Sequence, residues 1–234
     1  MKLLLLSNSR SEGLGYLEHA RDEIRSFLGS AKRVLFLPFA GVTIDWDDYA
    51  GRVAAALEPL GLESESAHRA GDPIAAIRSA EAIAVGGGNT WQLTREIHRR
   101  TLSEPIRDAV RGGTPYFGWS AGANVACPTM QTTNDMPICD PLGFDALGLV
   151  PFQINPHYLH GNPPGFKGET REERILEFGK LHPAVWVAGL REGTMLRIDE
   201  AAIRLIGSAP LRAFRHGEAP REVEPGADCG FLLG

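Results

Sequence analysis

Short apolar runs alternate with longer amphipathic stretches through the first half of the chain. A continuous apolar run is typical of a strand buried in a parallel sheet, and apolar residues spaced by three and four are typical of a helix packed on that sheet. The alternation predicts an α/β fold, with a doubly wound, mostly parallel sheet and helices on both faces. The predicted strands are residues 3–6, 34–37, 82–85 and 115–118, and the predicted helices are residues 16–28, 47–60, 74–77, 91–98 and 105–110.

The second half of the chain has a different pattern. Residues 127–169 are rich in Pro, Gly and Asn, which predicts long loops of a kind that is often functional. Thr170 and Glu173 have the spacing of a capping box, so a helix is expected to begin there. No repeat or linker interrupts the sequence, and we expect residues 1–234 to form one domain. Four later segments predict strands in an antiparallel finish: residues 185–188, 195–198, 202–206 and 211–214.

Composition and charge narrow the class of function. The chain carries 24 Lys and Arg against 29 Asp and Glu, a net charge of −5, and 43% of its residues are hydrophobic, as in ordinary globular proteins. The acidic balance argues against a nucleic-acid-binding surface and predicts that anionic ligands are repelled at long range. The sequence has no stretch of the ~20 apolar residues that span a bilayer, and its leucine run at 3–6 is too short for a signal peptide. We expect a cytoplasmic monomer or homodimer that contacts neither nucleic acid nor membrane.

The cysteines and histidines do not indicate a metal or a disulfide framework. Cys127, Cys139 and Cys229 form no C-x-x-C pair, and so sparse a set fits a reducing compartment. His157 and His160 are three residues apart, but no third ligand follows at a diagnostic spacing. We therefore expect neither a metal nor another cofactor.

A G-x-S-x-G motif follows a predicted strand directly. Gly118-Trp119-Ser120-Ala121-Gly122 comes after that strand and before a helix-compatible Ala-Asn-Val-Ala segment. This context is what a nucleophile elbow requires, because the turn from strand to helix is so tight that its neighbours must be small. A simple tight turn produces the same motif by chance, but the strand context favours Ser120 as a catalytic nucleophile.

A run of three glycines, Gly86 to Gly88, follows the preceding strand. Parallel strands end at the same edge of a sheet, so these glycines are expected to lie beside Ser120. Glycine N–H groups can approach a substrate oxygen because no Cβ obstructs them. We interpret Gly87 or Gly88, together with Ala121, as an oxyanion hole. A phosphate-binding turn is less favoured, because neither G-x-G-x-x-G nor a Walker A pattern is present.

A nucleophilic serine needs a base and a carboxylate that orients it. His157 is favoured as the base, because it lies in a loop after a strand predicted at 152–154 and Pro156 fixes the backbone before it. Asp135, in the loop after the elbow, and Glu192, after the strand predicted at 185–188, are both candidates for the carboxylate. The residue pattern does not choose between them.

Six segments resemble the peptidase E family of α-aspartyl dipeptidases, in the right order and over nearly the whole chain. The resemblance implies a fold similar to class I glutamine amidotransferases. It also implies a cytoplasmic serine peptidase that removes an N-terminal Asp from short peptides, chiefly dipeptides, with Ser120 as nucleophile and His157 as base. The family has been described with either carboxylate as the acid; we favour Glu192 and keep Asp135 as a residue that shapes the site. The segments are FLPFA at 36–40, GGGN at 86–89, GWSAGAN at 118–124, NDMPI at 134–138, INPHY at 154–158 and KGETRE at 167–172.

Specificity for an aspartate side chain requires a cation, because an unpaired buried carboxylate is very costly. Arg171 corresponds to the residue that the family is proposed to use, and its planar fork can bind a carboxylate through two hydrogen bonds. Without the resemblance, Arg171 would be taken for an exposed helix residue paired with a nearby Glu. Lys167 and Asn89 are further candidate substrate-binding residues.

Three alternatives stay open. An α/β-hydrolase esterase shares the elbow, but the 37 positions from Ser120 to His157 leave little room for that fold's intervening elements. A cyanophycinase-like peptidase is a relative that the segments at 135–138 and 167–171 disfavour. A non-catalytic peptide-binding protein on the same scaffold would bind peptides without using Ser120.

Overall fold

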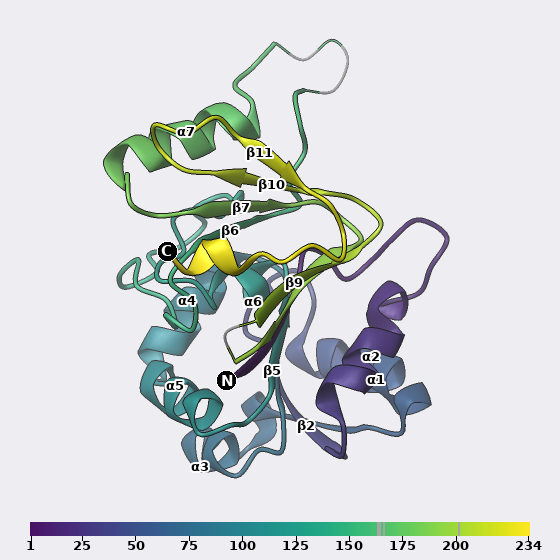
Figure 1. The fold of residues 1–234 in the computed structure, drawn as a ribbon. Helices are drawn as coiled ribbons and strands as arrows, with labels where there is room; N and C mark the ends of the chain where they lie inside the picture. The colour runs from purple at the N-terminus through teal and green to yellow at the C-terminus, as the bar shows by residue number, and fades with distance from the viewer. Residues whose placement is uncertain (163–164, 166, 201) are drawn as a thin grey trace.

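A seven-stranded sheet forms the centre of the computed structural model, which describes residues 1–162, 165, 167–200 and 202–234 (Figure 1). Its strands are β1 (Lys2–Leu6), β2 (Arg33–Leu37), β3 (Glu63–Ser66), β4 (Ile83–Val85), β5 (Tyr116–Trp119), β8 (Thr194–Asp199) and β9 (Ala202–Gly207). They lie in the order β3-β2-β4-β5-β1-β8-β9. The first five of these strands are parallel, and β8 and β9 extend the sheet in antiparallel order.

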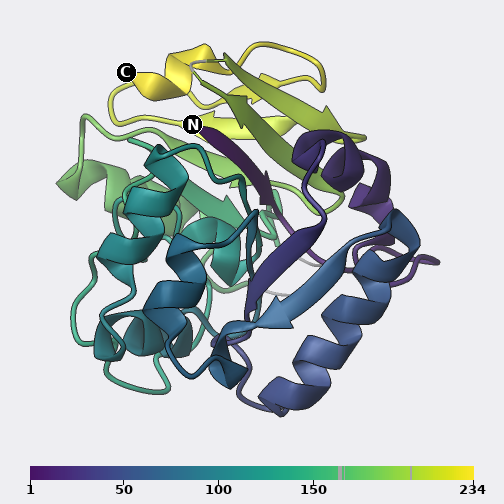
Figure 2. The same cartoon turned by 90° about the horizontal axis from the view of Figure 1, so that it is seen from below.

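Helices cover both faces of this sheet, as the sequence predicts (Figure 2). Successive residues of a strand point to opposite faces. Leu4 of β1 therefore shares a core with Phe27 and Val53, whereas Leu5 shares the opposite core with Ile106. The helices on the first face are α1 (Arg21–Leu28) and α2 (Trp46–Leu57), and those on the second are α3 (Pro73–Arg78), α4 (Thr90–Arg99) and α5 (Ser103–Arg111).

A second, four-stranded sheet lies above α4 in Figure 1, in the order β11-β10-β7-β6. Its strands are β6 (Gln153–Pro156), β7 (Val187–Leu190), β10 (Leu211–Phe214) and β11 (Arg221–Val223), and α7 (Arg171–Leu181) covers its outer face. β6 and β7 are parallel, whereas β7, β10 and β11 are antiparallel. The predicted antiparallel finish is thus divided between two sheets: β8 and β9 join the first, and β7 and β10 join the second.

Two strands, β3 and β11, lie where the apolar pattern predicts none. Both are edge strands: within the described residues, β3 pairs with β2 alone and β11 with β10 alone. Their residues are mostly polar and largely exposed or half-buried, so a hydrophobic pattern cannot detect them. β6 overlaps the strand predicted at 152–154 and extends it to Pro156. Its buried Asn155 donates through Nδ2 to the carbonyl oxygen of Thr132, at 2.9 Å.

Local sequence sets where α7 begins, and the remaining helices are single turns. Thr170 caps α7 with the reciprocal hydrogen bonds to Glu173 that the capping box predicts. The elbow helix, α6 (Ala121–Asn124), is a single turn. None of the helices in the described residues has the length and apolar content needed to cross a membrane. The 3₁₀ helices are Glu18–Ala20, Glu58–Leu60, Ala67–Arg69 and Gly230–Leu233.

Candidate active site

Ser120 lies in a strained turn between β5 and α6. Its φ of 53° and ψ of −113° are unusual for a residue with a side chain. Both glycines of the motif are required by close backbone contacts. A Cβ on Gly118 would lie 2.4 Å from the carbonyl oxygen of Gly122, and one on Gly122 would lie 2.0 Å from that of Val85. The turn therefore has the geometry of a nucleophile elbow.

The glycine turn lies against this elbow, as the order of strands predicts. β4 runs parallel to β5, and a Cβ on Gly87 would lie 3.0 Å from the Cβ of Ser120. The Tyr49 hydroxyl donates to the carbonyl oxygen of Gly87 at 2.9 Å, which fixes the peptide that also carries the N–H of Gly88. Within the described residues, the N–H groups of Gly87, Gly88 and Ala121 donate no hydrogen bond. They are available to a bound oxygen atom.

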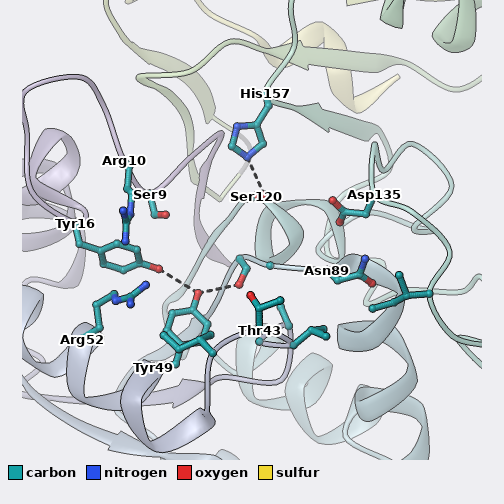
Figure 3. A pocket seen from close by; sticks show the side chains of 17 residues that line it. Ser9, Arg10, Tyr16, Thr43, Tyr49, Arg52, Asn89, Ser120, Asp135 and His157 are labelled. Carbon is teal, nitrogen blue, oxygen red and sulfur yellow. Dashed lines mark hydrogen bonds between the residues drawn. The ribbon is translucent and has the colours of Figure 1, made fainter.

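His157 and Glu192 reach Ser120 from the second sheet. They follow β6 and β7, whose parallel register sets Pro156 opposite Leu190. His157 Nε2 lies 2.9 Å from Ser120 Oγ, as Figure 3 shows, and Nδ1 lies 2.7 Å from Glu192 Oε1. A carboxylate can only accept, so Nδ1 carries the proton of the neutral ring and Nε2 accepts from the serine hydroxyl. The three side chains form one hydrogen-bonded chain.

Asp135, the other candidate carboxylate, faces different partners. Its Oδ2 accepts from the backbone N–H of Thr90 at 2.7 Å, from the Thr90 hydroxyl at 2.6 Å and from the Thr133 hydroxyl at 3.1 Å. Its Oδ1 accepts no hydrogen bond from the described residues. Asp135 lines the cavity in front of Ser120, so the structure separates the two carboxylates that the sequence left as alternatives.

Ser7 and Asn8 support this arrangement, and sequence reasoning missed both. The buried Ser7 hydroxyl donates to the carbonyl oxygen of Leu190 at 2.7 Å and accepts from the backbone N–H of His157 at 2.9 Å. Asn8 Oδ1 accepts from the N–H of Gly193 at 2.8 Å, next to Glu192. Their position directly after β1, at the sheet edge where ligands bind, is the feature of the sequence that could have indicated them.

A cavity of about 660 Å³ opens beside Ser120 (Figure 3). Its lining includes the predicted residues Ser120, His157 and Asp135. The lining residues that were not predicted from the sequence include three large ones: Arg10, Tyr16 and Arg52. No motif in the sequence connects these three residues. Arg10 and Tyr16 lie in the loop after β1, and Arg52 lies in α2.

Arg171 is half-buried at the first position of α7. Its Nη1 donates to the carbonyl oxygen of Pro156 at 3.2 Å, next to His157. Burial and the nearby Arg174 lower the pKa of Arg171, whereas Glu192 and Asp135 raise it. The guanidinium thus lies in the field of both candidate carboxylates, but outside the set of residues that line the cavity.

The other two predicted substrate-binding residues are placed differently. Asn89 lines the cavity, but its Oδ1 accepts from Gln92 N–H and its Nδ2 donates to the carbonyl oxygen of Met136, each at 3.0 Å. Its polar atoms cap α4 and hold the loop at 134–138. Lys167 is exposed and makes no hydrogen bond to the described residues. Those residues also contain no cluster of three His, Cys, Asp or Glu side chains able to hold a metal ion.

The sequence and the fold are both similar to those of known peptidases. Residues 3–206 match the model of peptidase family S51. The chain is 50% identical to peptidase E of Citrobacter koseri, over 97% of this chain and 99% of that protein. It is 48% identical to peptidase E of Nostoc sp., over 99% and 96% of the two chains. Its fold is similar to the crystal structure of a peptidase from an acI-B1 Actinobacterium, with a TM-score of 0.73 and 17% identity over 97% and 95% of the two chains.

Proposed function

The chain belongs to peptidase family S51, and from this premise we propose that it is a serine-type dipeptidase that hydrolyses the bond after an N-terminal aspartate. The observation that carries the proposal is the hydrogen-bonded chain from Ser120 through His157 to Glu192. Such a chain lets the imidazole take the serine proton while the carboxylate stabilises the charge that develops on the ring.

The proposed reaction passes through an acyl-enzyme. Ser120 Oγ attacks the carbonyl carbon of the N-terminal residue, and its proton moves to His157 Nε2. His157 then gives this proton to the leaving amine, and the peptide C–N bond breaks. In the second half, His157 takes a proton from water, the hydroxide attacks the ester, and the proton returns to Ser120.

The free N–H groups beside Ser120 support stabilisation of the tetrahedral intermediate. The N–H of Gly87 or Gly88 approaches from one strand end and that of Ala121 from the next. Because Tyr49 holds the Gly87 carbonyl, the donors are fixed before charge develops on the oxygen. Removing one such donor typically costs about 10²–10³ in kcat.

Charged groups beside the cavity suit the two charges of an N-terminal aspartate. We assign its ammonium to Asp135, whose Oδ1 is free among the described residues. We assign its side-chain carboxylate to Arg171, which is already partly desolvated and can form charge-assisted hydrogen bonds. The net negative chain would then attract the substrate's carboxylate only at short range, through a few cations positioned beside the cavity.

The test is a panel of four peptides: Asp-Leu, Glu-Leu, Asn-Leu and N-acetyl-Asp-Leu. Wild type should cleave Asp-Leu at least about 100-fold better than Asn-Leu, because Asn-Leu leaves the half-buried guanidinium of Arg171 without a carboxylate partner. Arg171→Ala should bring this ratio close to one, and the neighbouring exposed Arg174→Ala should leave it unchanged. Equal cleavage of Asp-Leu and Asn-Leu by wild type would refute the specificity.

Ser120→Ala separates the alternative functions. The proposal expects it to abolish turnover of Asp-Leu while the peptide still binds. Full turnover in this variant would eliminate the serine mechanism. Hydrolysis of p-nitrophenyl acetate without any Asp-Leu cleavage would favour an esterase, and cleavage of aspartyl–arginine polymer alone would favour a cyanophycinase-like activity. Binding of Asp-Leu without turnover by wild type would indicate a peptide-binding protein.

A further inference from the structure

Arg10 and Arg52 lie on one wall of the cavity, against the same aromatic ring. The Cζ atom of each guanidinium lies 5.9 Å from the centroid of Tyr16. Arg10 comes from the loop after β1 and Arg52 from α2, so two separate elements bring positive charge to one place. All three side chains line the cavity that holds Ser120.

These two arginines have no carboxylate partner within the described residues. Many other arginines of this acidic protein pair with carboxylates, as Arg69 does with Asp47 and Arg33 with Glu81. Arg10 and Arg52 make no salt bridge, although the described residues contain many acidic side chains. Two unpaired guanidinium groups facing one cavity are suited to bind an anion.

Tyr16, Trp119 and Tyr49 form an aromatic platform beneath the two arginines. The Tyr16 ring packs edge-on against Trp119 and Tyr49, and its hydroxyl donates to the Tyr49 hydroxyl at 3.1 Å. Burial raises the pKa of Tyr16, so the ring stays neutral between the two cations. Tyr49 in turn holds the carbonyl of Gly87, which connects the platform to the turn beside Ser120.

The arginine pair and Asp135 lie on opposite sides of Ser120. Figure 3 shows Arg10, Tyr16 and Arg52 on one side of the serine and Asp135 on the other. A peptide whose N-terminal residue lies on the Asp135 side therefore directs its leaving residue toward the arginines. In a dipeptide this residue ends in a carboxylate about one residue length, ~3.5 Å, beyond the scissile bond.

We propose that Arg10 and Arg52 form a subsite for the free C-terminal carboxylate of the leaving residue. This inference rests on the proposed dipeptidase function and adds the group by which the site recognises the end of the peptide. Guanidinium and carboxylate match in charge and geometry, so the pair selects a peptide with one residue after the scissile bond. A longer or amidated peptide offers the subsite no carboxylate at this position.

The experiment compares Asp-Leu with Asp-Leu amide, which differ only in this carboxylate. Wild type should show a kcat/KM about 10- to 100-fold higher for Asp-Leu, the range for charge-assisted hydrogen bonds. The double variant Arg10→Met, Arg52→Met should lower the value for Asp-Leu to that for the amide and change the amide value less than about twofold. Arg52→Lys, which keeps the charge, should retain part of the preference.

Controls and a binding measurement separate the outcomes. Arg111→Met, an exposed arginine at the end of α5, should leave both substrates unchanged. Calorimetry measures binding of Asp-Leu to the inactive Ser120→Ala variant. Replacing both arginines in that variant should weaken this binding by the same factor as kcat/KM. Equal cleavage of the two peptides by wild type, or an equal loss for both in the double variant, would overturn the subsite. Failure of wild type to cleave either peptide would instead refute the proposed function, on which the subsite depends.

Discussion

The Ser7 hydroxyl accepts a hydrogen bond from the backbone N–H of His157, at 2.9 Å. The same hydroxyl donates to the carbonyl oxygen of Leu190, at 2.7 Å. Ser7 follows β1 in the seven-stranded sheet, whereas the other two residues belong to the ends of β6 and β7 in the smaller sheet. One buried hydroxyl therefore connects the sheet that carries Ser120 to the strands that carry the imidazole and its carboxylate.

Replacing this hydroxyl should loosen the site. In Ser7→Ala, two backbone groups lose their partner, so we expect the free energy of unfolding to fall by about 1–3 kcal/mol and kcat for Asp-Leu to fall about 10-fold, at nearly constant KM. Chemical denaturation and steady-state kinetics measure the two effects. Ser66→Ala is the matched control, because Ser66 is also buried and bonded to a strand carbonyl, that of Phe36. An equal loss of kcat in both variants would contradict a positioning role for Ser7.

The two candidate carboxylates should differ in the kinetic parameter that they control. Glu192→Gln removes the charge next to His157 Nδ1, and we expect kcat to fall by about 10²-fold or more with KM little changed. Asp135→Asn should mainly raise KM for Asp-Leu, because it removes the proposed partner of the substrate ammonium. Steady-state kinetics of both variants decide the matter. The reverse pattern would identify Asp135 as the orienting acid.

A methyl group at Gly88 should disrupt the glycine turn. Gly88 has a φ of +137°, and a Cβ there would lie 2.3 Å from the carbonyl oxygen of Ala40. We expect Gly88→Ala to lower kcat/KM about 100-fold or more, because the displaced turn carries the proposed oxyanion donors. Gly51→Ala is the control: it lies within α2 with open space around it, so it should raise the free energy of unfolding by about 0.5–1 kcal/mol without affecting activity. Normal activity in Gly88→Ala would exclude the turn from catalysis.

His19 should make the protein less stable in mild acid. Both ring nitrogens are buried without a hydrogen-bond partner among the described residues, and burial lowers the pKa of His19, partly opposed by Glu192. The unfolded chain binds a proton near pH 6.5, above the pKa of the folded state. The contribution to stability is therefore fully present above pH 6.5 and is lost as pH falls from there through the lowered pKa. Melting temperatures at pH 7.5 and 5.5 should differ less in His19→Gln than in wild type, whereas exposed His216→Gln should behave as wild type. An unchanged difference in His19→Gln would rule out this source of acid sensitivity.

Much of the fold follows from local pattern. The apolar runs that form β1, β2, β4 and β5 are buried on both faces, and the capping box at Thr170 begins a helix as predicted. Ser120 and the glycine turn could be brought together from the sequence, because the ends of parallel strands meet at one edge. The strands that the pattern missed, β3 and β11, are edge strands whose residues are mostly polar. Backbone pairing with β2 and β10 defines them, and an apolar run does not.

The sequence by itself determined the parallel sheet, the elbow at Ser120 and the glycines beside it, because these depend on local backbone geometry and on the order of strands. Only the tertiary structure decided which carboxylate meets His157 and that Ser7 joins the two sheets. It also gathered Arg10 and Arg52 on one wall of the cavity. Those relationships join residues from separate elements, and their distances depend on how the sheets and helices pack. The net charge of −5 predicted repulsion of anions at long range, but local packing sets beside Ser120 two cations that have no carboxylate partner in the described part of the chain.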